Sequence, residues 1–311
     1  MYRVIEPKRI LAVDIGGSKL LTALADVSAQ GKVSFSGKVR RELAAGLGKE
    51  DIFSAVTDAV DRTLSLAGAE NGFDALGVTI PGLADPKTAR WIYAPFSGIR
   101  DFPIGERLAR KYRRPVCGEN DVNACAWAER LFGACRGIDD FLWVTVSNGI
   151  GGGLILGGKI FAGHFGCAAE FGHLKAVDGG ALCGCGGRGC LEAEAAGPAI
   201  ARRYALLTGK EGFSARDVAE AARRGDADAR EVYRKTGELL GKGAAAAANL
   251  LNPEAIVFGG GVAESFDLFV GGLIEKFNSD IMTFANKNVR ILKTELGYEA
   301  GLFAAASLPY R

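Results

Sequence analysis

The chain has 311 residues, of which 48% are apolar and 24% charged, and its formal net charge is +2. These ordinary globular values exclude a disordered, collagen-like or coiled-coil chain, and the length suggests two domains or one large split domain. Because no long run of one charge sign and no long apolar stretch occurs, we expect a cytoplasmic protein with no nucleic-acid or membrane partner. Glycine is unusually abundant, since its 44 residues make up about 14% of the chain, twice the usual ~7%. They cluster at 16–17, 149–153, 157–158, 179–189 and 259–261, which is typical of tight turns.

A pattern of three strands occurs near the start of the chain and returns in its middle. Apolar runs at 10–13, 20–25 and 33–39, with a glycine turn after the first, predict a β-meander. Runs at 141–146, 154–156 and 160–161, with glycine turns at 149–153 and 157–158, repeat that order. The repetition indicates the internal duplication of a whole domain.

Helical and strand patterns alternate in the rest of the chain. Helical spacing predicts helices at 52–67, 104–112, 122–132, 193–208, 215–224, 228–250, 268–278 and 300–307. Short apolar runs predict strands at 75–80, 115–118, 255–258 and 289–293. This alternation is typical of an α/β protein.

The turn after the first strand of each meander suits nucleotide phosphates. In the first turn a carboxylate that can associate with Mg²⁺ precedes bare backbone N–H groups. A plain hairpin turn is the alternative for either turn alone, whereas two turns at equivalent places favour a phosphate chain held between two lobes. Neither turn is a Walker A loop. The residues concerned are Asp14, Gly16, Gly17, Ser18 and Lys19 in the first turn, and Asn148 and Gly149 in the second.

Two further glycine strings need separate interpretation. Gly259, Gly260 and Gly261 follow a predicted strand and could let a nucleoside lie against backbone, with a plain loop as the alternative. The string at 184–189 matches G-x-G-x-x-G, but no strand precedes it and no helix opens on its last glycine. We therefore reject it as a dinucleotide site.

Asn120 and Asp121 follow a short predicted strand and open a helix. Both residue types are strong N-caps, so a purely structural role is one interpretation. The other is chemical: Asp121 as a general base that accepts a hydroxyl proton, and Asn120 as a sugar contact. The spacing alone does not separate the two.

The sharpest local signal is one histidine and three cysteines spaced H-x₉-C-x-C-x₄-C. Three thiolates and an imidazole complete a tetrahedral zinc set, which is structural because no position remains open for water. Reduced thiols without metal are the alternative. The ligands are His173, Cys183, Cys185 and Cys190. Glu170 and Glu192 flank this set, so the metal could hold them against a substrate, although either alone is typical of a solvated surface residue.

Together these motifs resemble the ROK family, which comprises bacterial sugar kinases and sugar-responsive repressors. The resemblance covers nearly the whole chain. Residues 14–19 are similar to the family's D-x-G-G-T-K, 81–82 to its P-G, 119–124 to E-N-D-x-N-A, 170–173 to E-x-G-H, 183–192 to C-x-C-G-x-x-G-C-x-E, and 299–301 to (D/E)-A-G.

The resemblance implies a two-lobed α/β fold, actin/Hsp70/hexokinase-like (ribonuclease H-like), with a duplicated β-meander core and a zinc-binding loop. ATP and a sugar would bind in the cleft between the lobes. We expect a smaller N-terminal lobe of residues 1–118 plus 298–311, and a larger C-terminal lobe of residues 119–297 that carries the zinc site. The family also suggests a homodimer.

The same resemblance implies roles for single residues. Asp121 would be the catalytic base that takes the proton from a sugar hydroxyl, typically the one on C6. Asp14 and the two glycine turns would hold the phosphates of Mg²⁺-bound ATP, and 259–261 would lie near the nucleoside. The sugar-binding residues would be Asn120, Asp121, Glu170, His173 and Glu192, with His173 also a zinc ligand.

We therefore expect an ATP-dependent kinase of a glucose-type hexose. The alternatives are a kinase of N-acetylmannosamine or N-acetylglucosamine, and a sugar-binding regulator without catalysis. A repressor of this family would need a helix-turn-helix before the first meander, and only thirteen residues precede Asp14.

Some residues depart from the family pattern. Ser18 replaces a Thr, Ser147-Asn148 replaces Gly-Thr, and Ala169 replaces the Gly of A-G-E. Phe96 stands where many members place an Asn that contacts the sugar, and its side chain cannot make that hydrogen bond. The identity of the sugar is therefore left open by the sequence.

Overall fold

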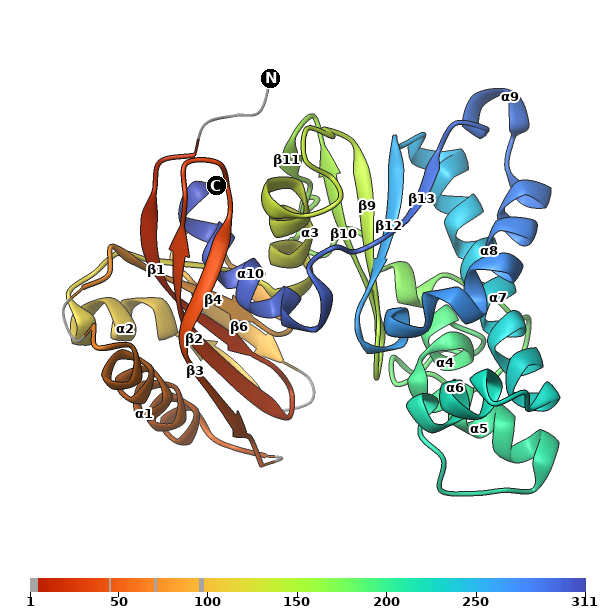
Figure 1. Ribbon diagram of the computed structural model, residues 1–311, viewed down its shortest axis with the longest axis horizontal. Helices are drawn as coiled ribbons and strands as arrows, with labels where there is room; N and C mark the ends of the chain where they lie inside the picture. Colours follow the sequence, from red (N-terminus) through yellow and green to blue (C-terminus); the bar gives the residue numbers. More distant parts are fainter. Residues whose placement is uncertain (1–4, 45, 70–71, 95–97) are drawn as a thin grey trace. The chain divides into compact units, whose positions relative to one another are not determined.

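The computed structural model describes residues 5–44, 46–69, 72–94 and 98–311 (Figure 1). The chain forms two compact units. The first comprises Met1–Asp139, Gly153–Ala168 and Tyr298–Arg311, and the second Asp140–Gly152 and Ala169–Gly297. This division differs from the predicted domains, 1–118 plus 298–311 and 119–297, because residues 119–139 and 153–168 group with the first unit.

The first unit is built on a five-stranded sheet of order β3-β2-β1-β4-β8 within the described residues. β1 pairs antiparallel with β2 and parallel with β4, β2 pairs antiparallel with β3, and β4 pairs parallel with β8. The predicted first meander is therefore confirmed. The strands are β1 (Lys8–Ile15), β2 (Lys19–Val27), β3 (Val33–Glu42), β4 (Ala75–Ile80) and β8 (Val116–Asn120).

Helices cover both faces of this sheet (Figure 1). The apolar sides of α1 (Lys49–Ala67) and α2 (Ile104–Tyr112) share one core with Leu11, Val13 and Val78. On the other face lies α10 (Ala300–Ser307), where Gly77 leaves room for the carbonyl of Ala305. α3 (Asp121–Phe132) packs against α10.

A small sheet in the first unit was not predicted from the sequence. It has the order β5-β6-β7, from β5 (Leu83–Asp85), β6 (Arg90–Ala94) and β7 (Ile99–Phe102). Its strands are only three to five residues long, and such short runs give little periodicity to detect.

The second sheet repeats the plan of the first. Its order is β11-β10-β9-β12-β13, with β12 parallel to both β9 and β13. A meander followed by two parallel strands thus occurs twice, which confirms the predicted duplication and the α/β fold class. The strands are β9 (Phe141–Val146), β10 (Ile150–Leu156), β11 (Lys159–Ile160), β12 (Ala255–Gly259) and β13 (Arg290–Lys293).

Among the second unit's helices in the described residues, α6, α7 and α8 match predicted ones. They are α4 (Leu191–Ala195), α5 (Gly197–Thr208), α6 (Ala215–Arg223), α7 (Ala227–Leu251), α8 (Phe266–Asp280) and α9 (Thr283–Asn286). The single helix predicted at 193–208 is wrong, because the chain breaks at Ala196, which has an extended backbone. Pro198 then lies in the first turn of α5, where its missing N–H costs nothing.

Short 3₁₀ turns lie at the ends of several elements. They are η1 (Phe171–His173), η2 (Gly261–Ser265), η3 (Gly297–Glu299) and η4 (Leu308–Tyr310). η1 carries a predicted zinc ligand, and η2 connects the glycine run at 259–261, the third glycine run, to α8.

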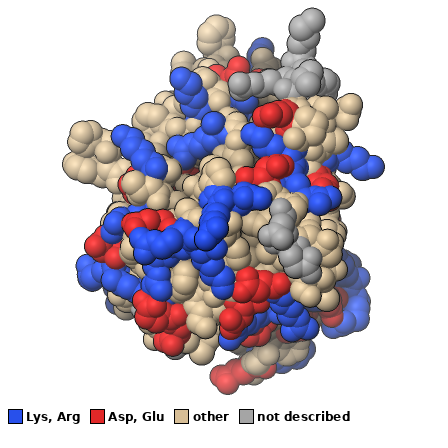
Figure 2. Space-filling model, turned by 90° about the vertical axis from the view of Figure 1, so that its left-hand side faces the viewer, with Lys and Arg blue, Asp and Glu red and all other residues tan. Residues whose placement is uncertain are grey.

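The surface carries mixed charge. The face in Figure 2 shows Lys and Arg side chains interspersed with Asp and Glu. In the first unit, for example, Arg107 pairs with Glu50 and Lys111 with Asp61. None of the helices in the described ranges is long and apolar enough to cross a membrane.

Candidate active site and metal centre

Three neighbouring strands of the first sheet bring polar side chains into one row. Asp14 on β1 lies opposite Thr79 on β4, which lies opposite Glu119 on β8. The Thr79 hydroxyl donates to Asp14 Oδ1 over 2.7 Å. Burial raises the pKa of Asp14, against the opposing effects of this hydrogen bond and of the Lys19 charge. Asp14 is therefore a desolvated carboxylate that a cation would stabilise.

The first glycine turn joins β1 to β2 beside Asp14. The Gly16 N–H donates to the Lys19 carbonyl over 2.8 Å, which closes the turn and leaves Gly17 and Ser18 exposed. The Lys19 ammonium lies 4.6 Å from the ring centroid of Tyr298, a cation–π contact. The turn is thus closed on itself, with its tip open to solvent.

Thr79 and Gly301 complete the surroundings of Asp14, and sequence reasoning singled out neither as a site residue. Gly301 lies at the start of α10, and a Cβ there would collide with the Asp14 carboxylate. The string Glu299-Ala300-Gly301 was the signal for Gly301. Thr79 had no local signal, because its role depends on strand pairing.

Asn120 caps α3 and also contacts the next residue. Its Oδ1 accepts from the N–H groups of Val122 and Asn123, each over 3.0 Å. Its Nδ2 donates to the Gly82 carbonyl (2.8 Å) and to Asp121 Oδ1 (3.0 Å). The capping interpretation of Asn120 is therefore confirmed, and the same side chain orients Asp121.

Asp121 has an unusual electrostatic environment. Desolvation and the nearby charge of Asp14 raise the pKa of Asp121 to about 7, although hydrogen bonds from Val122 and Asn120 oppose the rise. The Asn120 side-chain amide and the Val122 backbone N–H both donate to Oδ1, which leaves Oδ2 as the acceptor. A carboxylate with a pKa near neutrality is suited to general-base catalysis.

In the second unit, Glu192 holds the second glycine turn. Glu192 Oε2 accepts from the Ile150 N–H over 3.0 Å, and Gly149 faces the same carboxylate. The turn is also fixed from α5, since the Gly197 N–H donates to the Ser147 carbonyl over 2.8 Å. Asn148 is exposed at the tip of the turn.

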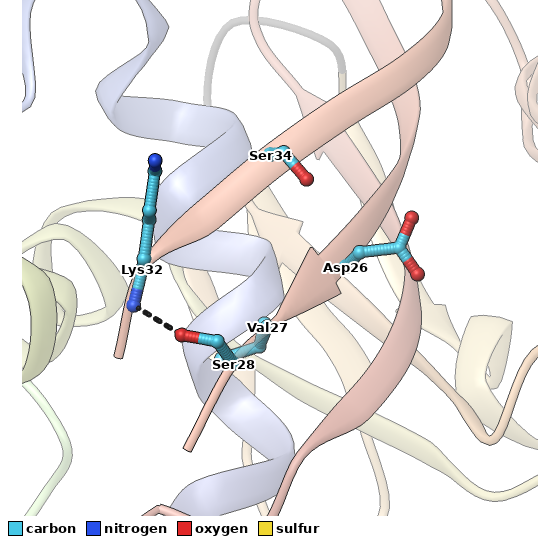
Figure 3. A pocket seen from close by; sticks show the side chains of 5 residues that line it. All are labelled: Asp26, Val27, Ser28, Lys32 and Ser34. Atoms are coloured by element: carbon cyan, nitrogen blue, oxygen red, sulfur yellow. Dashed lines mark hydrogen bonds between the residues drawn. The ribbon is translucent and has the colours of Figure 1, made fainter. Parts of the chain in front are cut away.

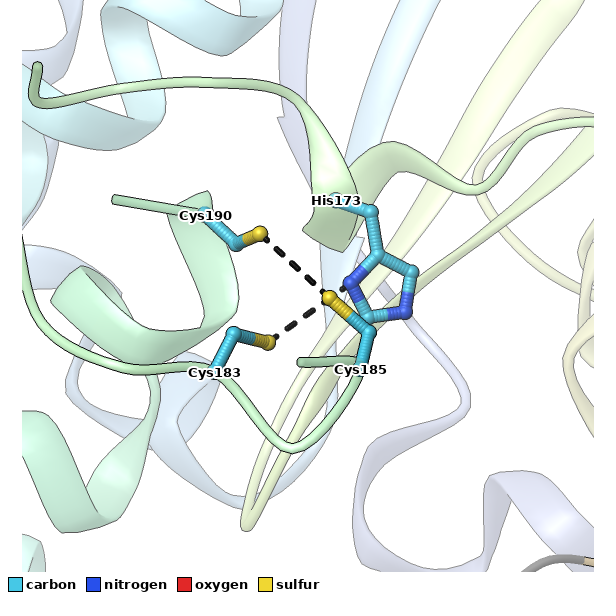
Figure 4. Close-up of side chains that lie close together, drawn as sticks. All are labelled: His173, Cys183, Cys185 and Cys190. Atoms are coloured by element: carbon cyan, nitrogen blue, oxygen red, sulfur yellow. Dashed lines mark hydrogen bonds between the residues drawn. The ribbon is translucent and has the colours of Figure 1, made fainter. Parts of the chain in front are cut away.

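The predicted zinc ligands converge in the second unit (Figure 4). Their donor atoms all lie within 4.8 Å of one another. Cys185 Sγ and Cys190 Sγ are 3.7 Å apart, and Cys183 Sγ is 3.8 Å from His173 Nδ1. A tetrahedral ion with Zn–S bonds of ~2.3 Å would separate its ligand atoms by about 3.7 Å. The four side chains therefore fit a structural zinc ion.

The surroundings of the cluster also suit a metal. The Lys175 ammonium lies 3.1 Å from Cys190 Sγ, where it would compensate thiolate charge. On the far side of the imidazole, His173 Nε2 lies 3.8 Å from Glu170 Oε2. Glu192 Oε1 lies 3.7 Å from Cys183 Sγ. The cluster thus brings Glu170, His173 and Glu192 to one place.

The chain matches the ROK family over residues 10–311. It belongs to the ROK family. It is 32% identical to the glucokinase of Streptomyces coelicolor over 96% of each chain. It is also 32% identical to the DNA-binding transcriptional dual regulator NagC of Escherichia coli, over 75% of this chain and 59% of the regulator.

A solved structure supports the same assignment. The ROK glucokinase of Streptomyces griseus, in complex with glucose and AMPPNP, superposes with a TM-score of 0.81 at 32% identity. The match covers 97% of this chain and 100% of that one. The fold of this ROK protein is therefore actin/hexokinase-like, as the sequence resemblance implied.

The third glycine run of this ROK chain ends β12 and begins η2. A Cβ at Gly259 would lie 2.7 Å from the Trp143 ring, and Gly260 has a φ of +87° beside the Val146 carbonyl. Both positions thus require glycine for packing and backbone reasons. Gly261 is more open, with Ser147 Oγ 3.6 Å from the place of a Cβ.

One pocket lies apart from these features. The pocket is lined by Asp26, Val27, Ser28, Lys32 and Ser34 at the β2–β3 turn (Figure 3). It lies at the opposite end of β2 from Lys19, so it does not belong to the candidate site. Phe96, which departs from the ROK pattern, lies outside the described residues.

Proposed function

We propose that this ROK protein is an ATP-dependent kinase that phosphorylates glucose or a glucose-type hexose at its 6-hydroxyl, with Asp121 as the general base. The observation that carries the proposal is the Asp121 carboxylate, which has a pKa of about 7 and one oxygen left to accept a proton. The similarity to a glucokinase solved in complex with glucose and AMPPNP supports glucose and ATP as the substrates.

In this reaction Asp121 Oδ2 accepts the hydroxyl proton while the sugar oxygen attacks the γ-phosphorus of ATP and ADP leaves. Asn120 keeps Asp121 oriented through its contact with Oδ1. The N–H groups of the two glycine turns, at 16–19 and 148–149, would hold phosphate oxygens. Gly259, Gly260 and Gly261 would approach the nucleoside.

Asp14 would hold the Mg²⁺ that accompanies ATP. Its desolvated carboxylate accepts one hydroxyl hydrogen bond over 2.7 Å, and a divalent cation would stabilise its negative charge. When bound, Mg²⁺ neutralises charge on the β- and γ-phosphates.

The zinc cluster would position residues that bind the sugar. His173 would bind the zinc ion through Nδ1, which would fix its imidazole so that Nε2 and Glu170 together can hold sugar hydroxyls. Glu192 links the cluster to the second glycine turn and would also bind the sugar. Magnesium, the homodimer and the cytoplasmic location stay predictions.

A second candidate function is favoured by the relationship to NagC, which is a regulator. A sugar-binding protein without catalysis, or a kinase of an N-acetylated amino sugar, would use the same carboxylates and zinc cluster. The presence of Asp14, Asp121 and both glycine turns favours catalysis over binding alone.

The test is ADP release with glucose, mannose, fructose, allose, N-acetylglucosamine and N-acetylmannosamine, followed by identification of the phosphorylated carbon by NMR. We expect the highest kcat/KM with glucose and a 6-phosphate product. An N-acetylated sugar as the best substrate would favour the second candidate. Sugar binding without turnover would indicate a regulator.

Cys185→Ser tests the zinc proposal. The variant should lose bound zinc and sugar affinity together, because three ligands no longer complete the tetrahedral set. Zinc is measured by mass spectrometry and sugar affinity by calorimetry. Cys167→Ser changes an exposed cysteine outside the cluster and should alter neither. Full zinc content in Cys185→Ser would show that the ligand set is wrong.

A further inference from the structure

Glu119 is a buried carboxylate two residues before Asp121. Its residue is 2% exposed, and its Oε1 accepts from the Asn120 N–H over 2.9 Å. Asn123 Nδ2 lies 3.5 Å from the same oxygen. The other oxygen accepts a hydrogen bond from Arg311 Nη1. A buried carboxylate is costly without a cationic partner, and Arg311 supplies one.

Arg311 reaches Glu119 because the segment from 300 to 311 packs over the row of Asp14, Thr79 and Glu119. Side chains in register on neighbouring parallel strands point to the same face of a sheet. Gly301 touches the Asp14 end of the row and Arg311 the Glu119 end. Between them, the Trp127 indole donates to the Ser307 carbonyl over 3.2 Å, which attaches α3 to the same segment.

We propose that Arg311 is a positioning residue for Asp121 that acts through Glu119. The proposal rests on the proposed role of Asp121 as base. Arg311 holds the Glu119 carboxylate, Glu119 holds the Asn120 N–H, and the Asn120 side chain holds Asp121 Oδ1. Without the guanidinium, Glu119 turns toward water, and the start of α3 loses one of its restraints.

Steady-state kinetics of Arg311→Met and Arg311→Lys test this role. Because misplacing a catalytic group by ~1 Å can cost ~10²-fold, we expect Arg311→Met to lower kcat by about tenfold. The KM values for sugar and ATP should stay within about twofold, since Arg311 is not among the proposed ligand-binding residues. Arg311→Lys restores a cation and should recover most of the loss. A kcat of Arg311→Met within twofold of the wild type would overturn the proposal.

The control and the double variant separate positioning from general damage. Arg110→Met removes a surface pair with Glu106 on α2 and should leave kcat unchanged. In Glu119→Gln the side-chain oxygen can still accept from Asn120, but no buried charge needs Arg311. Arg311→Met should therefore add little to Glu119→Gln. Equal effects of Arg311→Met in both backgrounds would show that Arg311 acts elsewhere.

Hydrogen exchange provides a measurement that does not depend on turnover. In the ligand-free protein, Arg311→Met should speed amide exchange over residues 120–123, while the α1 amides keep their protection. Exchange that rises throughout the first unit would indicate loss of stability alone. Unchanged exchange at 120–123 would refute the proposed positioning of Asp121 by Arg311. If the wild type phosphorylates no sugar, the proposed function fails, while the positioning role of Arg311 is still tested by the exchange rates.

Discussion

At the residue scale, two carboxylates of the same unit differ in environment and in proposed task. Asp14 is held by the Thr79 hydroxyl, and Asp121 by Asn120 and the first turn of α3. The charge of Asp14 is the second cause, after desolvation, that raises the pKa of Asp121. Burial thus raises the pKa of both carboxylates, and in Asp121 the charge of Asp14 adds to this effect.

This pair predicts a pH dependence of activity. A general base must be deprotonated, so activity should fall as pH drops below the pKa of the base, which is about 7 in the ligand-free protein. In the protein without ATP and Mg²⁺, Asp14→Asn removes the neighbouring negative charge, which should lower the pKa of Asp121. The measurement is an NMR titration of the Asp121 carboxyl in the ligand-free wild type and in ligand-free Asp14→Asn. A pKa of Asp121 that is unchanged or higher in Asp14→Asn would contradict the account.

Ala169 carries local strain next to Glu170. Its φ is +65°, a left-handed conformation that costs a residue with a Cβ about 1–2 kcal/mol. Ala169→Gly should raise the free energy of unfolding by about 0.5–1 kcal/mol, measured by urea denaturation. Ala168→Gly, at a neighbouring residue without positive φ, should lower it slightly. Lower stability of Ala169→Gly would mean that the methyl group contributes packing that outweighs the strain.

At the element scale, glycine determines how closely helices can pack. α7 and α8 approach each other where a Cβ at Gly237 would collide with the Phe269 carbonyl, and one at Gly241 with the Leu273 carbonyl. The abundance of glycine in the sequence therefore serves helix contacts as well as turns. This second use was not predicted, because the helical pattern of 228–250 does not reveal which face meets a backbone.

Gly237→Ala tests this contact. Alanine favours a helix by about 1 kcal/mol over glycine, but the added methyl must push α8 away at a cost of about 1–3 kcal/mol. We therefore expect a net loss of about 1 kcal/mol in the free energy of unfolding. Gly271→Ala on α8 meets nothing within 4 Å and should stabilise the protein. The measurement is chemical denaturation of both variants. Stabilisation by Gly237→Ala would show that the two helices separate easily.

At the scale of the whole molecule, the sequence predicted what local patterns encode. Both meanders, their glycine turns and the spacing of the zinc ligands are short-range signals, and the structure contains them. The Thr79–Asp14 bond, the Glu192–Ile150 bond and the Arg311–Glu119 pair join residues far apart in the chain. They depend on strand register and on how the segment after residue 298 packs, which no local pattern contains.

The division into units illustrates the same limit. The sequence suggested a boundary at 118/119, where a strand meets a helix. In the structure α3 packs on α10 through Trp127 and Ser307, so residues 119–139 belong to the first unit. A helix joins the unit whose core it covers, and that core is assembled from distant segments.

The measurement that tests the central claim most directly is single-turnover phosphorylation of glucose by Asp121→Asn, with sugar affinity determined by calorimetry on the same sample. Asparagine keeps the shape and the contact with Asn120 but cannot accept the proton. Since general-base catalysis contributes ~10²–10⁴-fold, we predict that glucose binding is largely retained and the phosphoryl-transfer rate falls by at least about 10²-fold. A near-normal rate in Asp121→Asn would contradict the assignment of Asp121 as the base.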